Sequence, residues 1–195
     1  MRRLALLVAA LVCASCVAVS RHPIRGELPL ALDPELAGTW RPLDNGKPAR
    51  NGEVVEFLSH GDHYAVIPGD DEHVMEATTA RLGGHRYLNL VEVGSEAPDL
   101  LFLARYEIRA GVLSIAPLDE DAIRPFVESG ALRGVHAALS DSGEPLDSSS
   151  GRTKDVLITA TSDELDAFLL THDPLVLFPP DEDLTLIRES DAGAR

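Results

Sequence analysis

Cysteine, lysine and aromatic residues are scarce in this chain of 195 residues. There are two cysteines and one tryptophan, aromatic residues make up 5%, and the only lysines are Lys47 and Lys154. Acidic residues outnumber basic residues by 32 to 17, which gives a formal net charge of −15. Because such a surface repels phosphate backbones, we predict that the protein binds no nucleic acid. The low aromatic content also argues against a large binding cage lined by aromatic rings.

The sequence also lacks the motifs of several enzyme classes. It contains no Gly-x-Ser-x-Gly nucleophile elbow, no P-loop and no dinucleotide-binding fingerprint. Carboxylates are too numerous for any pair to stand out, and the acidic run at 119–121 is explained by helix capping. We therefore predict no catalytic residue and no cofactor. A hydrolase whose site is assembled from distant residues is an alternative for which the sequence names no residue.

The N-terminus has the pattern of a secretory signal. Two arginines follow Met1, and residues 4–19 then carry no charge. This run of 16 residues is short for a membrane-spanning helix, which needs about 20. A basic start, an apolar stretch and small residues at its end are typical of a signal peptide.

The sequence Cys-Ala-Ser-Cys at 13–16 resembles the lipobox of bacterial lipoproteins, in which small residues precede an invariant cysteine. The resemblance implies that the signal is removed before Cys16 and that Cys16 receives acyl chains such as palmitate. Cys13 stands where this family usually has leucine. Val17 stands where an aspartate would favour the inner membrane, which implies an outer-membrane location, facing the periplasm or the surface. Cleavage after Ala18, which would release a free secreted protein, is the alternative.

Both cleavage sites leave the mature chain without a disulfide, so the fold must depend on its core alone. We predict a signal peptide at 1–15 and a lipidated N-terminus and tether at 16–34. A single β-rich domain at 35–190 and a frayed tail at 191–195 complete the chain. Prolines in the segment 18–34 are the reason for predicting a tether there.

Alternating apolar and polar residues predict a series of hairpins. The most apolar piece is 99–118, in which two strands meet at Ala110-Gly111, and Gly111 supplies the positive φ of a tight turn. Arg105 and Glu107 alternate with the apolar residues there, and we predict a solvent-facing polar row. A buried pair that orients a ligand is the alternative. Four further strands are expected at 53–59, 63–68, 75–82 and 87–93. Six strands with short turns predict an antiparallel meander that forms a barrel or a curved sheet.

In the later part of the chain, the apolar residues recur at the spacing of a helix instead. Asp119 begins a helix that Gly130 ends, and 131–139 is expected to form another helical turn. Residues 156–159 predict a strand. Thr161 and Glu164 form a capping box for a second helix. Residues 184–188 predict a closing strand, so the fold class is mainly β (α+β) with two short helices late in the chain.

The Gly38-Thr39-Trp40 sequence resembles the Gly-x-Trp entry of lipocalin-like barrels, in which the tryptophan packs across the barrel floor. The whole pattern of lipoprotein-type signal, Gly-x-Trp sequence, meander, capped helix and last strand resembles small bacterial lipoproteins with a lipocalin-like β-meander domain. That resemblance implies that a lipid or other small apolar ligand binds between the inward faces of the strands. The ligand-binding candidates are Trp40, Phe57, Leu88, Leu90, Phe102 and Tyr106. A filled core made by the same residues is the alternative.

Histidines around one turn are the candidates for a metal site. His60 and His63 flank Asp62, and His73 follows the next strand. Imidazole and carboxylate groups suit zinc. Turns are polar without any metal, however, so we predict solvated turn residues and no bound ion. The sequence as a whole predicts a cell-envelope lipoprotein that acts as a binding or interaction module, with an envelope protein or an apolar ligand as its partner.

Overall fold

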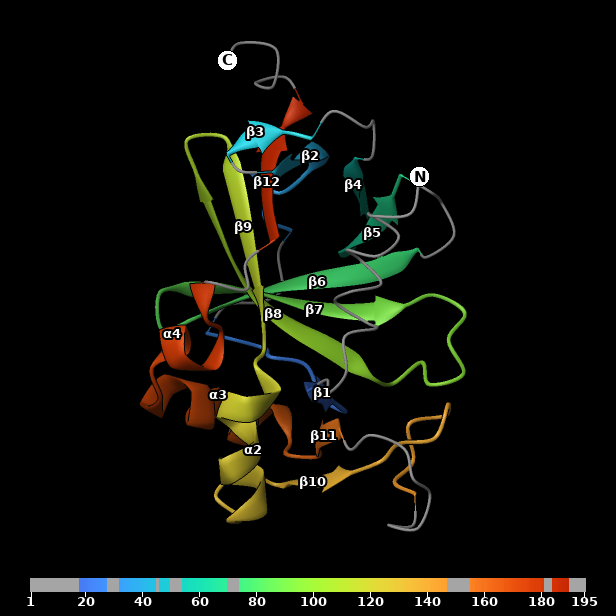
Figure 1. Cartoon of the computed structure of the whole chain (residues 1–195), viewed down its shortest axis with the longest axis vertical. Coiled ribbons are helices and arrows are strands. Elements are labelled where there is room, and N and C mark those ends of the chain that lie inside the picture. Colours follow the sequence, from blue (N-terminus) through green and yellow to red (C-terminus); the bar gives the residue numbers. More distant parts are fainter. Residues whose placement is uncertain are drawn as a thin grey trace.

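The computed structural model describes residues 18–27, 32–44, 46–49, 54–69, 74–146, 155–180 and 184–189. Most of the strands form a barrel in the upper part of the molecule, and the helices lie below it with two short strands (Figure 1). The single polypeptide thus builds a barrel and a second layer against its outer face.

The barrel is an eight-stranded antiparallel closed sheet, which confirms the predicted mainly β fold class and, of the barrel and the curved sheet that were expected, corresponds to the barrel. The strands follow the order β8-β7-β6-β5-β4-β2-β12-β9, and β9 then pairs with β8 to close the ring. A two-residue strand β3 (Lys47–Pro48) adds to β2 outside this path. Their bounds are β2 Gly38–Asp44, β4 Val55–His60, β5 His63–Pro68, β6 Met75–Leu82, β7 His85–Glu92, β8 Leu101–Arg109, β9 Val112–Pro117 and β12 Leu184–Arg188.

The six expected meander strands and the closing strand are all present, with ends that shift by a few residues. Tight turns join β4 to β5, β6 to β7 and β8 to β9, and each contains a residue with positive φ. The turn between β8 and β9 has Ala110 at φ 50° and Gly111 at φ 77°, as a primed hairpin turn requires. The predicted Ala110-Gly111 turn is therefore confirmed.

Three further strands extend the sheet beyond the barrel. They are β1 (Ala18–Ser20), β11 (Asp155–Ile158) and β10 (Gly134–Ala137). The start of β8 pairs with β1, since Val19 lies opposite Phe102, whereas the rest of β8 pairs with β9. β1 pairs in parallel with β11, and β11 pairs with β10. One strand, β8, therefore belongs to both the barrel and the extension.

The predicted tether is wrong for the described residues 18–27. Ala18 and Val19 are each 4% exposed within β1, and Ile24 is fully buried. The amide of Ile24 donates to Oδ1 of Asn89 at 2.8 Å, and Nδ2 of Asn89 donates back to its carbonyl at 3.0 Å. Residues 18–27 therefore belong to the folded domain, because this segment finds its partners on distant strands.

The second layer is inserted between β9 and β12. It contains α2 (Glu120–Glu128), α3 (Ser162–Thr171) and the single turn α4 (Pro174–Leu177). Asp119 caps α2, and the capping box of Thr161 and Glu164 is present at the start of α3. The helical turn expected at 131–139 is wrong, because residues 134–137 form β10 by pairing with β11.

Two hydrophobic cores hold these layers. One fills the barrel interior, and the other lies between the outer face of β6, β7 and β8 and the helices. Alternate residues of one strand serve the two cores, so Leu88 faces the interior and Tyr87 the outer layer. Full burial of a large apolar side chain contributes about 1.5–3 kcal/mol. The stability of the described domain thus comes from apolar packing on both faces of one sheet.

Candidate functional site

The barrel interior brings together the predicted ligand-binding residues. Five of the six belong to the interior core and are buried, and the sixth, Phe102, is partly buried against it. The five are Trp40, Phe57, Leu88, Leu90 and Tyr106. The inward alternation deduced from the sequence is therefore correct.

One end of the barrel is closed by the segment at 33–37, which we call the floor segment. Trp40 is fully buried beside it and donates from Nε1 to the carbonyl of Leu36 at 2.8 Å. Arg188, at the end of β12, places its guanidinium 4.4 Å from the Trp40 ring centre. The same guanidinium donates to the carbonyl oxygens of Ala37, at 2.7 Å, and Glu35. The first and last barrel strands are thereby joined to the floor segment.

Asp33 is the polar centre of this closed end. Its carboxylate accepts a hydrogen bond from the Tyr106 hydroxyl at 2.9 Å and lies 3.1 Å from the Arg86 guanidinium. Its carbonyl accepts from the Tyr64 hydroxyl at 2.5 Å. Burial, together with the negative charge of Asp33, raises the pKa of both tyrosines. Sequence reasoning missed Asp33 because it fell within the predicted tether.

Within the barrel interior, exposure differs slightly between two groups of residues. Trp40, Tyr64, Leu88 and Leu186 are 0% exposed. The barrel there is filled with side chains, as in other small barrels. Further along the strands Met75 and Ile115 are each 6% exposed and Leu90 is 7% exposed, and Phe102 and Leu184 are partly exposed. We call this second group, whose members keep some solvent exposure, the apolar rim.

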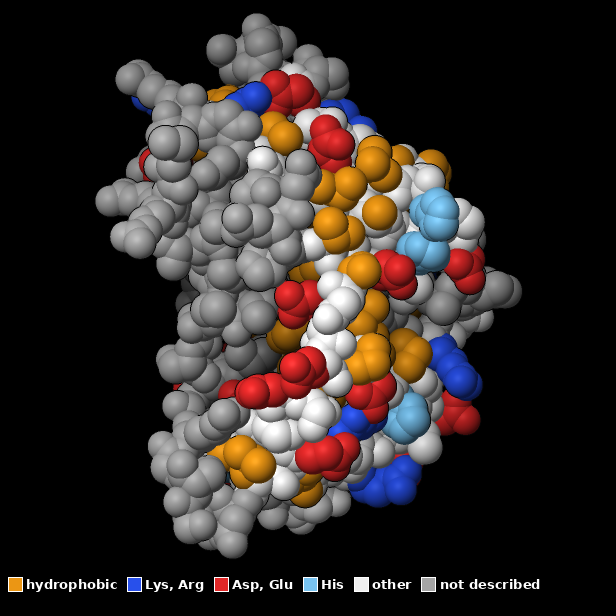
Figure 2. Space-filling view, turned by 90° about the vertical axis from the view of Figure 1, so that its right-hand side faces the viewer, with side chains coloured by type: hydrophobic (Ala, Val, Ile, Leu, Met, Phe, Trp, Pro, Cys, Tyr) orange, Lys and Arg blue, Asp and Glu red, His pale blue; other side chains and the backbone are white. Residues whose placement is uncertain are grey.

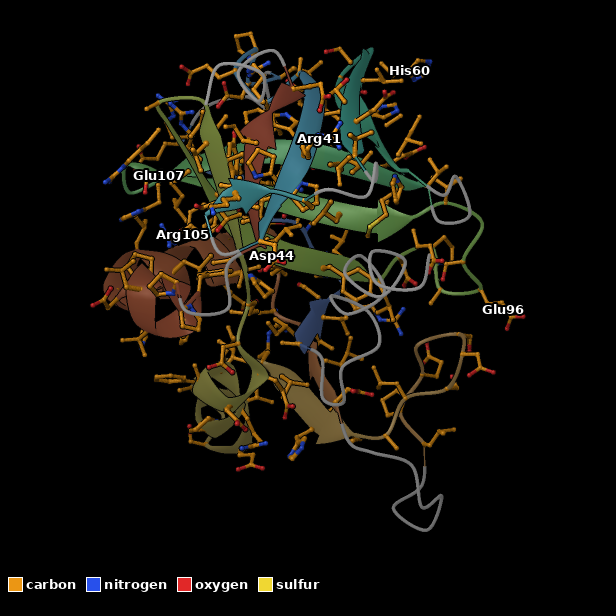
Figure 3. All side chains as sticks on the ribbon, turned by 45° about the horizontal axis from the view of Figure 1, so that its top comes forward. Arg41, Asp44, His60, Glu96, Arg105 and Glu107 are labelled. Carbon is orange, nitrogen blue, oxygen red and sulfur yellow. The ribbon has the colours of Figure 1, made fainter. Side chains whose placement is uncertain are left out.

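The outer layer changes the expectation for Arg105. Its side chain was predicted to face solvent, but the residue is only 8% exposed, and its Nε has no hydrogen-bond partner among the residues that the structure describes. Figure 3 places Arg105 beside the helices, whereas Glu107 lies farther along the strand, with 43% of its side chain exposed. Burial raises the pKa of the neighbouring Tyr87 to about 12. The helices inserted after β9 account for the difference, because they cover this part of β8.

The predicted metal candidates separate into two groups. His60 and His63 adjoin each other, with Nδ1 of His60 and Nε2 of His63 3.2 Å apart. His73 and the lipidation candidate Cys16 lie outside the described residues. Within the ranges that are described, no cluster of three or more histidine, cysteine, aspartate or glutamate side chains is placed to hold a metal ion.

Two further observations complete the description of the candidate site. Among the described residues, no helix has the length and hydrophobicity needed to cross a membrane. The chain matches no protein-family model, no curated protein and no solved structure. The barrel interior, with its closed floor and its apolar rim, is therefore the candidate site on the strength of its geometry alone.

Proposed function

We propose that this protein is a lipid-anchored component of the bacterial cell envelope whose barrel domain acts as a binding or interaction module. The observation that carries the anchoring half is the position of β1. Strand β1 begins at Ala18, and Ala18 and Val19 are each 4% exposed between β8 and β11. Signal removal before Cys16 would leave this strand whole. Cleavage after Ala18 would remove one of its three residues.

The short distance from Cys16 to β1 has a consequence for the anchored protein. Two residues span at most about 7 Å, so acyl chains on Cys16 would hold the folded domain directly against the bilayer surface. Several acyl chains on one cysteine would supply the multiple signals that stable anchoring requires. The proposal is thus of a domain that sits close to the membrane rather than at the end of a long linker.

The binding half of the proposal rests on the barrel. Closed antiparallel barrels of this size accommodate either a packed core or one small ligand. Core residues beside the floor segment, such as Trp40 and Tyr64, have no exposure, whereas the apolar rim retains some. A small apolar ligand that enters at the rim and reaches only the near half of the interior is the carrier variant of the proposal. A protein partner at the envelope is the other variant.

Metabolic labelling with an alkyne analogue of palmitate in a bacterial host tests the anchoring half. We expect the wild-type chain to be labelled and Cys16→Ala to be unlabelled. Cys13→Ala is the matched control, since Cys13 lies in the signal peptide and its removal should leave the label in place. An unlabelled wild-type chain, or equal labelling of Cys16→Ala, would show that Cys16 is not the anchor.

Native mass spectrometry of residues 17–195, which include every described residue, tests the carrier variant. A reproducible added mass in protein secreted without lipid would identify a ligand. Leu90→Trp should reduce that mass, because the larger side chain enters the rim. Val91→Trp on the outer face of the same strand is the matched control and should keep it. A clean mass for the wild-type chain would argue against a carrier and favour a protein partner.

A further inference from the structure

The tip of the β4–β5 hairpin presents two histidines to each other. His60 ends β4, His63 begins β5, and the two are cross-strand partners. Gly61 has φ 65° in the two-residue turn between them, which brings the strand ends together. The imidazole rings meet edge to face with their centres 5.0 Å apart. Figure 2 shows two adjoining histidine side chains at the right-hand edge, bordered by hydrophobic and acidic side chains.

We propose that this pair binds a zinc ion, with Nδ1 of His60 and Nε2 of His63 as its protein ligands. These two nitrogen atoms are 3.2 Å apart. In a tetrahedral site with zinc–nitrogen distances of about 2.0–2.1 Å, two ligand nitrogens stand about 3.3 Å apart. The hairpin therefore already holds the imidazoles at the separation that a shared ion requires.

Asp62 orients one of the two ligands. Its Oδ1 lies 3.1 Å from Nδ1 of His63. An ionised carboxylate can only accept a hydrogen bond, so Nδ1 of His63 carries the proton and Nε2 presents a lone pair toward His60. A carboxylate behind a histidine in this way is the usual outer-shell partner of a metal-bound imidazole. The turn thus supplies both the ligands and the group that sets the tautomer of one of them.

Binding needs one change of tautomer and no net loss of a proton. With both rings neutral, no ion bound and the proton of His63 on Nδ1, Nδ1 of His60 is the donor to Nε2 of His63. With the ion between the two nitrogens, His60 carries its hydrogen on Nε2 instead, and both facing lone pairs bind zinc. Water would fill the remaining positions, or a side chain of another molecule. The net charge of −15 favours a cation at the surface.

The affinity should be lower than that of a structural zinc site, because the described part of the chain supplies two ligands rather than four. The ion would join the ends of β4 and β5, so zinc should also raise the thermal unfolding temperature by mass action. Direct binding and the thermal shift are therefore two readouts of the same event.

Calorimetric titration with zinc chloride, and NMR of the histidine rings, test the proposal on untagged protein covering residues 17–195. We expect one zinc per chain, with shifts confined to the rings of His60 and His63. His60→Asn and His63→Asn should each abolish saturable binding and the thermal shift. Asp62→Asn should weaken binding by about tenfold while the two ligands remain.

His85→Asn is the matched control, because His85 also begins a strand after a tight turn but lies opposite Leu82 rather than a histidine. It should bind zinc as the wild type does. The histidine variants change only the exposed tip of a hairpin, and their circular dichroism should match that of the wild type. Absence of binding in the wild type, or unchanged binding in both His60→Asn and His63→Asn, would overturn the proposal.

Discussion

The Arg188 guanidinium lies 4.4 Å from the centre of the Trp40 ring and donates a hydrogen bond to the Ala37 carbonyl at 2.7 Å. One side chain from the last strand therefore holds both the tryptophan of the first barrel strand and the floor segment. Its planar fork matches the two carbonyl oxygens of Ala37 and Glu35, which a lysine ammonium would not do equally well. This contact closes the ring of strands at its filled end.

Arg188→Met should destabilise the domain. It removes a cation–π contact that contributes about 0.5–2 kcal/mol and leaves two carbonyl groups without their donor, which costs about 1–3 kcal/mol for each one shielded from water. Urea unfolding followed by tryptophan fluorescence measures this, since Trp40 is the only tryptophan. Arg188→Lys should recover part of the loss. Wild-type stability for Arg188→Met would show that the contact does not support the floor.

The three tyrosines of the chain should resist ionisation together. Burial raises the pKa of Tyr64, Tyr87 and Tyr106 above the ordinary value of 10.0. A raised pKa in the folded state stabilises the protein below pH 10 and loses that contribution as the pH rises through the raised value. For Tyr87 this window runs from pH 10 to about 12.

Near-ultraviolet absorbance of tyrosinate during alkaline titration measures this behaviour. We expect little tyrosinate at pH 10 and a cooperative rise that coincides with loss of the circular dichroism signal. Tyr87→Phe should reduce the amplitude by one tyrosine. Gradual ionisation of all three tyrosines near pH 10 in the folded protein would contradict the burial of their hydroxyl groups.

Asn89 should be essential for docking of the N-terminal segment. Its amide satisfies both the N–H and the carbonyl of fully buried Ile24, at 2.8 and 3.0 Å. Asn89→Leu leaves both backbone groups unpaired, at a cost of about 1–3 kcal/mol each. Chemical denaturation and amide hydrogen exchange of residues 18–27 measure the loss.

Thr78→Val is the matched control for Asn89. It removes only the hydrogen bond that Nδ2 of Asn89 donates to Oγ1 of Thr78 at 3.2 Å. Its effect should therefore be smaller, about 1 kcal/mol. If residues 18–27 exchanged their amide hydrogens freely in the wild type, the segment would be the tether that its sequence suggested.

The start of α3 should be sensitive to acid. Hydrogen bonds from Arg133 and from the backbone and side chain of Thr161 lower the pKa of Glu164 to about 2. A lowered carboxyl pKa stabilises the folded state above the ordinary value of 4.5, and the contribution is lost as the pH falls from 4.5 to about 2. Glu164→Gln should flatten the stability curve in this range.

Thermal unfolding across the acidic range measures the effect of Glu164. Thr161→Ala should cost about 0.5–2 kcal/mol at neutral pH, because the helix loses its cap. Thr161→Ser keeps the hydroxyl and should remain close to the wild type. An identical acid profile for Glu164→Gln and the wild type would show that the capping box does not contribute.

The hairpins of the barrel could be predicted because their causes are local. Alternation along β8 decides which residues face inward, and Gly111 permits the turn that follows. For the same reason the capping box of α3 was recognised from Thr161 and Glu164 alone. The interior candidates follow directly from this alternation, which is why they meet in one core.

The predictions that were wrong concern segments whose structure depends on partners that are distant in the sequence. Residues 134–137 are a strand only because β11 lies beside them, and Ala18–Ser20 because β8 and β11 flank them. Arg105 is buried because helices that follow later in the chain cover β8. None of these contacts produces a periodic pattern of apolar and polar residues within the segment itself.

By itself, the sequence determined the meander, its turns, the inward faces of its strands and the caps of its helices, since each depends on neighbours within a few residues. Only the tertiary structure decided that the barrel closes, that Ala18–Ser20 form a strand, that Tyr106 bonds to Asp33 and that Arg188 lies over Trp40. Closure, docking of the N-terminal segment and the floor require residues that lie far apart in the sequence. Such pairings are selected by the packing of the whole fold rather than by local preference.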